Sequence, residues 1–130
     1  MTRAHPSRGP LAGLRVLDIA TIVAAPAAAA LLADYGAEVL KVELPSGDGS
    51  RSFAPLKDGK ALWWKVTNRN KKLVSLDLRK PEGVALLKRL LPRFDVLIEN
   101  FRPGTLDRWG LDRDTLWALQ PRLVILRATA

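Results

Sequence analysis

The sequence contains no cysteine, and its 130 residues include a single histidine, His5. Without cysteine, the chain has no disulfide framework, no thiolate nucleophile and no metal site with cysteine ligands. His5 lies in a polar segment beside a proline, far from any apolar run, and no serine, histidine and acidic residue form a set typical of triad hydrolases. The sequence therefore predicts chemistry without a bound metal ion, a thiol or a hydrolytic triad.

Long apolar runs are also missing. The longest nearly uncharged stretch, residues 19–33, is too short and too rich in alanine to cross a bilayer. The first ten residues, MTRAHPSRGP, lack the apolar core of a signal peptide. We therefore expect a soluble, cytoplasmic protein with no membrane partner, in which residues 1–12 form a flexible leader.

Acidic side chains are fewer than basic ones. The chain has 21 lysines and arginines against 13 aspartates and glutamates, which gives a formal net charge of +8. Such an excess favours a polyanionic partner, which could be nucleic acid, anionic lipid or a phosphate-rich small molecule. The net charge alone does not choose among these three.

Short apolar runs alternate with helix-forming segments through most of the chain. The runs predict strands over residues 14–20, 37–43, 73–78, 94–99 and 122–130. Helices are predicted over residues 26–34, over 81–91 and in two shorter segments after residue 104. Residues 61–67 are ambiguous, and residues 44–60 have the composition of a long surface loop. This alternation predicts an α/β fold of the Rossmann-like class, which is a parallel sheet with helices on both faces.

Hydrogen-bonding side chains crowd into VLIENFRPGTLDRWG, residues 96–110, where one predicted strand ends. Asn100 offers an amide, Phe101 an aromatic face, and Arg102 and Arg108 planar guanidinium groups that suit phosphate. Parallel sheets bind ligands beyond the carboxyl ends of their strands, which is where this cluster falls. A purely local role is equally compatible with the pattern, because an asparagine can turn the chain and a phenylalanine can pack beneath it.

A second polar cluster, NRNKK at residues 68–72, places three cations and two amides on one predicted turn after Trp63 and Trp64. Cations and amides beside aromatic surface suit phosphate binding. The alternative is a solvated turn before a strand, with both tryptophans in the core. The sequence leaves both interpretations open.

Several segments occur together, in order and at the spacing of one known family. They are GLRVLDIATIVAAPAAAALLADYGAEVLKVE (13–43), GDGSR (47–51), NRNKKLVSLDL (68–78), DVLIENFRPGTLDRWGL (95–111) and QPRLVI (120–125). This combination resembles the N-terminal part of the family III CoA-transferases, the L-carnitine dehydratase and bile-acid-inducible family. The resemblance implies that residues 13–130 form a Rossmann-like CoA-binding domain that is incomplete relative to the family.

The resemblance also implies an activity and partners. Family members move CoA between an acyl-CoA and a carboxylic acid, with CoA as a substrate and no tightly bound cofactor or metal. They form an interlocked homodimer of ring-like subunits, so we expect a homodimer here or a complementing C-terminal chain. The α-methylacyl-CoA racemases share these motifs and are an alternative reading.

The resemblance assigns contacts with CoA to six residues: Ile22, Leu76, Leu78, Asn100, Phe101 and Arg108. It places Ile22 near the acyl-CoA site, Leu76 and Leu78 beside the adenosine, and Arg108 at the phosphates. Leu44 departs from the pattern, because some members carry a CoA-binding arginine at this position. Changes at other motif positions leave the acyl specificity open.

The aspartate nucleophile of the family lies in the segment that follows the last strand predicted here. The sequence ends at Ala130, before that position, so we assign no catalytic residue and expect the chain alone to be inactive.

An interpretation from a different functional class is a basic nucleic-acid-binding module built on residues 68–72 and the tryptophans. The basic residues are scattered rather than gathered on one element, so we expect no nucleic-acid partner.

Overall fold

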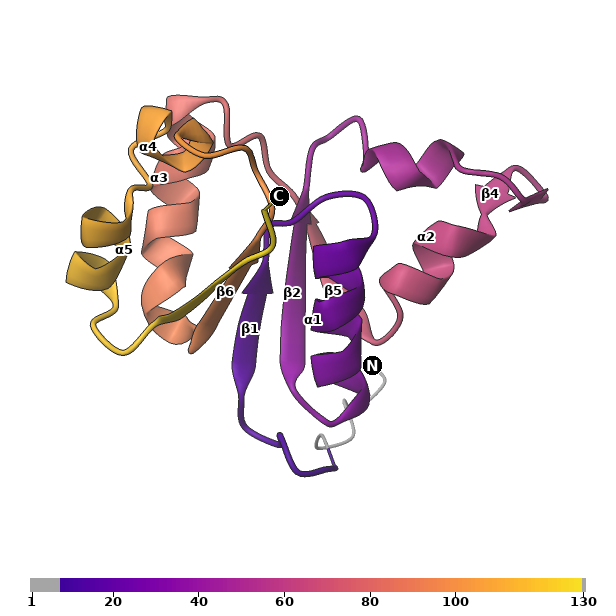
Figure 1. Ribbon diagram of the computed structural model, residues 1–130, viewed down its shortest axis with the longest axis horizontal. Coiled ribbons are helices and arrows are strands. Elements are labelled where there is room, and N and C mark those ends of the chain that lie inside the picture. Colours follow the sequence, from indigo (N-terminus) through magenta and orange to yellow (C-terminus); the bar gives the residue numbers. More distant parts are fainter. Residues whose placement is uncertain (1–7, 130) are drawn as a thin grey trace.

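The computed structural model describes residues 8–129, in which strands and helices alternate (Figure 1). The strands are β1 (Arg15–Asp18), β2 (Glu38–Glu43), β3 (Leu56–Lys57), β4 (Lys60–Ala61), β5 (Lys71–Ser75), β6 (Val96–Glu99) and β7 (Val124–Arg127). The helices are α1 (Ala24–Asp34), α2 (Leu62–Thr67), α3 (Pro81–Leu90), α4 (Thr105–Arg108) and α5 (Arg113–Leu119), with 3-10 turns η1 (Gly49–Ser52) and η2 (Leu91–Arg93). Among these residues, no helix has the length and apolar character that a transmembrane span requires.

Five strands form one parallel sheet in the order β5-β2-β1-β6-β7. In the centre of this sheet Leu17 of β1 lies between Leu40 of β2 and Leu97 of β6. The strand order reverses between β1 and β6, and in doubly wound sheets ligands bind beyond the carboxyl ends of the strands at such a point. In Figure 1 this edge of the sheet is at the top.

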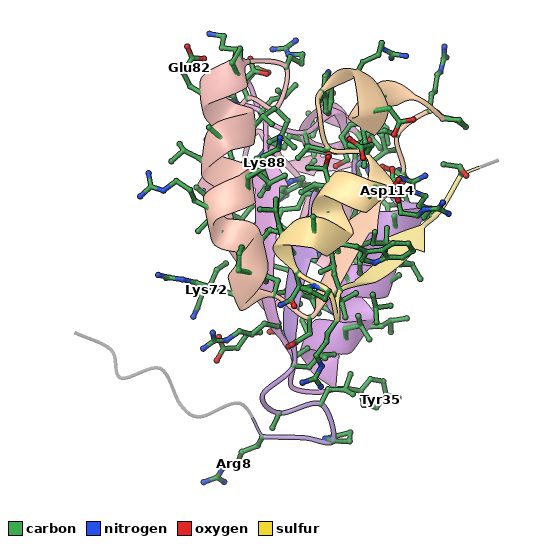
Figure 2. All side chains as sticks on the ribbon, turned by 90° about the vertical axis from the view of Figure 1, so that its left-hand side faces the viewer. Arg8, Tyr35, Lys72, Glu82, Lys88 and Asp114 are labelled. Atoms are coloured by element: carbon green, nitrogen blue, oxygen red, sulfur yellow. The ribbon has the colours of Figure 1, made fainter. Side chains whose placement is uncertain are left out.

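Helices cover both faces of the sheet, as the sequence predicts for the Rossmann-like class. One face packs against α1, whose alanines allow close approach: Ala25 and Ala29 are fully buried against Val16 and Ile98. The other face packs against α3 and α5, which Figure 2 shows in front of the sheet, through a second apolar cluster. That cluster includes the buried side chains of Leu17, Leu87, Leu91, Leu97 and Leu116.

The boundaries of several segments differ from the prediction: the strands expected over residues 14–20 and 122–130, for example, are the shorter β1 and β7. The strand expected over residues 73–78 is β5, which begins two residues earlier, at Lys71, and ends at Ser75. Lys71 enters the sheet because its side chain turns inward to a buried carboxylate, which an apolar pattern does not reveal. The ambiguous segment 61–67 contributes α2, and the expected long loop contains η1 and the short β3–β4 hairpin.

The expected leader is only partly described. Residues 1–7, which include His5, lie outside the described part of the chain. Residues 10–13 form a turn, and the Leu11 amide donates a 3.0 Å hydrogen bond to the carbonyl of Tyr35, just after α1.

Candidate functional site

An apolar cleft of about 270 Å³ opens at the carboxyl edge of the sheet. Its walls come from α4 and from the segments that follow four strands, β1, β2, β5 and β6, and they include Ile19, Leu44, Leu76, Leu78, Phe101 and Trp109. Three of the six predicted site residues, Leu76, Leu78 and Phe101, therefore face one space although 25 positions separate the first from the last in the chain. They converge because the carboxyl ends of parallel strands meet at the same edge.

The ring of Phe101 is held by its neighbours. It meets Trp109 edge to face, with ring centroids 5.1 Å apart and an interplanar angle of 71°. The Phe101 amide donates a 2.8 Å hydrogen bond to the carboxylate of Glu99, which is itself paired with Arg127 at 2.9 Å. The aromatic wall of the cleft is thus fixed through its backbone and through its ring.

A basic depression of about 370 Å³ adjoins the apolar cleft and shares Leu78, Arg79 and Trp109 with it. Its walls carry four cationic side chains: Arg79, Lys80, Lys88 and Arg108. Arg108 donates a 3.1 Å hydrogen bond to the Thr105 hydroxyl and is otherwise exposed. Lys88, labelled on α3 in Figure 2, is half-buried. An apolar cleft beside a cluster of cations suits a ligand in which a flat ring is linked to phosphate groups.

Arg79 lines both the apolar cleft and the basic depression. Its guanidinium group makes two 2.8 Å hydrogen bonds with the carboxylate of Asp77. These bonds lower the pKa of Asp77 to about 2. The pair fixes the turn after β5 that also presents Leu76 and Leu78.

Asn100 lies at the end of β6, but its side chain is engaged inside the protein. Its side-chain oxygen accepts a 2.8 Å hydrogen bond from the backbone amide of Thr21, and its side-chain nitrogen donates a 2.8 Å hydrogen bond to the Thr21 carbonyl. Asn100 therefore ties the loop after β1 to the end of β6. The direct contact with CoA expected for Asn100 remains a prediction, to which the structure adds this positioning role.

Ile22 lies in the same loop and lines neither the apolar cleft nor the basic depression. Its backbone is in the left-handed region, with φ of +70°, which a β-branched residue rarely adopts. Its side chain is exposed, and its amide donates to the carboxylate of Asp48. The structure thus places Ile22 directly after Thr21, the residue that Asn100 holds, and its position near the acyl-CoA site stays a prediction.

Four buried charges lie beneath this loop, and the sequence pattern does not reveal their pairing. Lys71 donates to Asp18 at 2.8 Å and to the Pro26 carbonyl at 2.7 Å. Lys41 lies 3.8 Å from Asp18 and 3.9 Å from Asp48, and also donates to the carbonyl of Ala20. A lysine in the middle of an apolar strand, as in AEVLKVE, was the available signal, because a buried lysine needs a partner.

The NRNKK turn is occupied by internal contacts. Arg69 and Asn70 both bind the carboxylate of Asp34, and Lys71 belongs to the buried charge network. Trp63, by contrast, is 48% exposed. These contacts favour the structural interpretation of the turn over phosphate binding, although the first of its two tryptophans is not in the core.

A metal centre has no donor set in the described part of the chain. Residues 8–129 contain no group of three or more histidine, cysteine, aspartate or glutamate side chains placed to hold an ion.

Arg102, the other cation of the 96–110 segment, lines a separate small polar hollow of about 50 Å³.

Comparison with known sequences gives long, close matches. The chain is 52% identical over 122 residues to the beta subunit of succinyl-CoA–L-malate CoA-transferase from Chloroflexus aurantiacus, covering 92% of this chain and 30% of that protein. It is 49% identical over 131 residues to succinyl-CoA–D-citramalate CoA-transferase of the same organism, covering 99% and 32%. The chain therefore spans about a third of the length of these relatives.

Solved structures agree with the sequence matches. The crystal structure of Rv3272 from Mycobacterium tuberculosis superimposes with a TM-score of 0.88 at 40% identity, covering 95% of this chain and 35% of that one. A CAIB/BAIF family protein from Brucella suis gives a TM-score of 0.85 at 40% identity, covering 92% and 33%. The sequence model of CoA-transferase family III matches residues 11–130. The chain therefore belongs to CoA-transferase family III.

Proposed function

We propose that this chain forms the CoA-binding part of an enzyme that moves CoA between an acyl-CoA and a carboxylic acid. The observation that carries the proposal is the adjacency of the apolar cleft to the basic depression, with Leu78, Arg79 and Trp109 in both. In CoA, the adenine ring is attached to a ribose that carries a phosphate group and a diphosphate. A ligand of this shape needs apolar walls next to several cations.

Each predicted residue takes a role in this arrangement. The adenosine lies in the apolar cleft beside Leu76 and Leu78, with Phe101 as an aromatic wall. The phosphates lie over the basic depression, where Arg108 contacts them. Arg79, Lys80 and Lys88 add positive charge there, which compensates for Leu44 at a position where some members carry arginine.

The remaining two residues belong to the acyl end of the site. Ile22 lies beside the acyl group, and Asn100 contacts CoA while it holds the neighbouring Thr21. Two relatives are named for reactions between succinyl-CoA and L-malate or D-citramalate. These names support a dicarboxylic acyl group as the substrate class, with CoA as the substrate and no tightly bound cofactor.

The proposal also covers the assembly of the protein and the residues that carry out the reaction. Relatives named as alpha and beta subunits of one transferase support an assembly of more than one chain, and we propose a homodimer or a complementing second chain. Residues 13–130 form the CoA-binding domain, incomplete relative to the family, and none of them is assigned as the nucleophile. We place the protein in the cytoplasm.

The two alternatives from the sequence receive no support. The relatives described above are CoA-transferases, not racemases. Arg69 and Lys71, on which a nucleic-acid surface would depend, are engaged by Asp34 and Asp18.

Titration of CoA and dephospho-CoA, followed by NMR, tests the proposal. We expect CoA to bind the wild-type chain and Arg108→Ala to weaken that binding about tenfold, because a charge-assisted bond to phosphate is lost. Arg113→Ala is the matched control, because Arg113 stacks over Trp117 on α5, with 5.3 Å between the guanidinium carbon and the ring centroid, and lines neither hollow. Equal CoA binding by the wild type and Arg108→Ala would remove the phosphate role of Arg108. No binding of CoA by the wild type would contradict the proposed function.

A further inference from the structure

The loop between β1 and α1 holds an unfavourable backbone conformation at the edge of the proposed site. Ile22 has φ of +70°, and its side chain is 38% exposed, so packing of that side chain alone does not enforce this geometry. For a residue with a branched Cβ, the left-handed region is disfavoured by steric contact with the backbone. Such a conformation persists only where surrounding contacts determine it, and these positions are often functional.

Asp48 makes the contact that determines it. The Ile22 amide donates to both carboxylate oxygens of Asp48, at 3.1 and 3.3 Å. The Asp48 side chain is 2% exposed, and Lys41, whose side chain is fully buried, lies 3.9 Å away as its counter-ion. Asp48 comes from the segment after β2, 26 positions along the chain from Ile22.

Asp48 also caps η1, since its carboxylate accepts the Ser50 amide at 2.8 Å and the Ser50 hydroxyl. A cap of that turn needs only one oxygen and no buried counter-ion. The second oxygen is directed to Ile22, while the adjacent Thr21 is held on both its amide and its carbonyl by Asn100. Two side chains from the segments that follow β2 and β6 therefore fix two successive residues of one loop.

We propose that Asp48 is a positioning residue for the acyl end of the CoA site. It holds the Ile22 backbone in the left-handed conformation and so directs the Ile22 side chain toward the acyl group, and the buried Lys41, 3.9 Å away, helps to hold the carboxylate in place. This inference rests on the proposed function, because it gives the loop its ligand. Asp48 itself touches no ligand and takes no part in bond making.

The test uses Asp48→Asn and Asp48→Ser in the full chain. The serine keeps a capping oxygen for η1, so that variant separates the cap from the bond to Ile22, and Lys41 keeps its second neighbouring carboxylate, Asp18. Asp112→Asn is the matched control, because Asp112 caps α5 through a 2.9 Å bond from the Thr115 amide and lines neither hollow. The readouts are hydrogen exchange of the Ile22 amide, the Ile22 methyl resonance, and the affinities for succinyl-CoA and for adenosine 3′,5′-bisphosphate.

Both Asp48 variants should accelerate exchange of the Ile22 amide about tenfold or more and shift its methyl resonance. They should weaken succinyl-CoA binding about tenfold, because the loop of the free variant then holds the binding conformation only about a tenth of the time, and leave adenosine bisphosphate binding unchanged. Asp112→Asn should change none of these readouts. An unchanged exchange rate of the Ile22 amide, or an equal loss of affinity for succinyl-CoA and for adenosine bisphosphate, would overturn the role of Asp48. If the wild type bound neither ligand, the proposed function would fail instead, and the exchange data would still decide whether Asp48 holds Ile22.

Discussion

Removal of the Asp18 carboxylate is a direct perturbation of the charge network beneath the site. The side chains of Asp18, Lys41 and Lys71 are fully buried, and Asp18 lies 2.8 Å from Lys71 and 3.8 Å from Lys41. Asp18→Asn keeps the shape of the side chain and removes its charge. Two buried lysines then share a single nearby carboxylate, that of Asp48, which lies 3.9 Å from Lys41.

The geometry gives a magnitude. At an effective dielectric constant of about 20, Coulomb's law gives about 6 kcal/mol for the pair of charges 2.8 Å apart. The net loss is smaller, because hydration of the ions in the unfolded chain opposes the attraction, and removal of one partner from a buried pair costs roughly 3–5 kcal/mol. A domain of this kind has a free energy of unfolding of roughly 5–15 kcal/mol, so Asp18→Asn should remove a large part of it.

The loss should also depend on pH. Burial lowers the pKa of Lys71, and Asp18 opposes that shift, so its removal lowers the pKa of Lys71 further. A lysine with a depressed pKa binds fewer protons in the folded state than in the unfolded state, so stability rises with pH. The deficit of Asp18→Asn should therefore shrink as the pH rises toward about 10, where the unfolded lysine also loses its proton.

Urea unfolding, followed by tryptophan fluorescence at several pH values, measures both effects. Asp34→Asn is the matched control, because Asp34 also pairs with a cation, Arg69, at the protein surface, where ion pairs contribute little. A loss in Asp18→Asn no larger than in Asp34→Asn would refute the reasoning. A deficit that grew with pH would do the same.

Three further changes probe the backbone and the charges around the cleft. Gly83→Ala should destabilise the fold by about 1–3 kcal/mol in urea unfolding, because its Cβ would lie 2.0 Å from the Asp77 carbonyl oxygen; a gain, as alanine normally gives inside a helix, would contradict this. Ile22→Gly should be about 1 kcal/mol more stable than Ile22→Ala, because only glycine accepts φ of +70° without strain, and the reverse order would remove the argument for strain. Arg79→Gln should raise the pKa of Asp77 from about 2 toward its ordinary value in a carbon-detected NMR titration, and an unchanged pKa would show that Arg79 is not its cause. Since a depressed carboxyl pKa stabilises the fold above the unfolded pKa, the wild type should lose this contribution as the pH falls from about 4 toward 2, and the variant should lose less.

The sequence was sufficient for the architecture because the sheet is buried on both faces. Apolar runs marked each of its strands, and the helix-forming segments between them required parallel pairing. That pairing also predicted that residues after β5 and β6 meet, as Leu76, Leu78 and Phe101 do in the apolar cleft. The start of β5 was wrong by two residues, because a charged side chain, Lys71, is buried there.

The details of the site could not be predicted in the same way, because they depend on contacts between distant positions. Asn100 and Thr21 are 79 positions apart, and Asp48 and Ile22 are 26 positions apart. Nothing in the residues around Ile22 indicates a left-handed backbone, since isoleucine is among the residues least suited to it. Hydrogen bonds from two other loops impose this conformation, and only a three-dimensional structure shows them.

The central claim is that CoA binds at the carboxyl edge of the sheet, and mapping of CoA-induced chemical-shift changes over the chain tests it most directly. The account predicts changes that cluster at Leu76, Leu78, Phe101 and Arg108. A separate hollow of about 280 Å³, lined by Leu90 and Phe94 among others, includes the amino ends of β1 and β2 and serves as an internal reference. Changes that cluster around this hollow at the amino ends, and leave the carboxyl edge unaffected, would contradict the account.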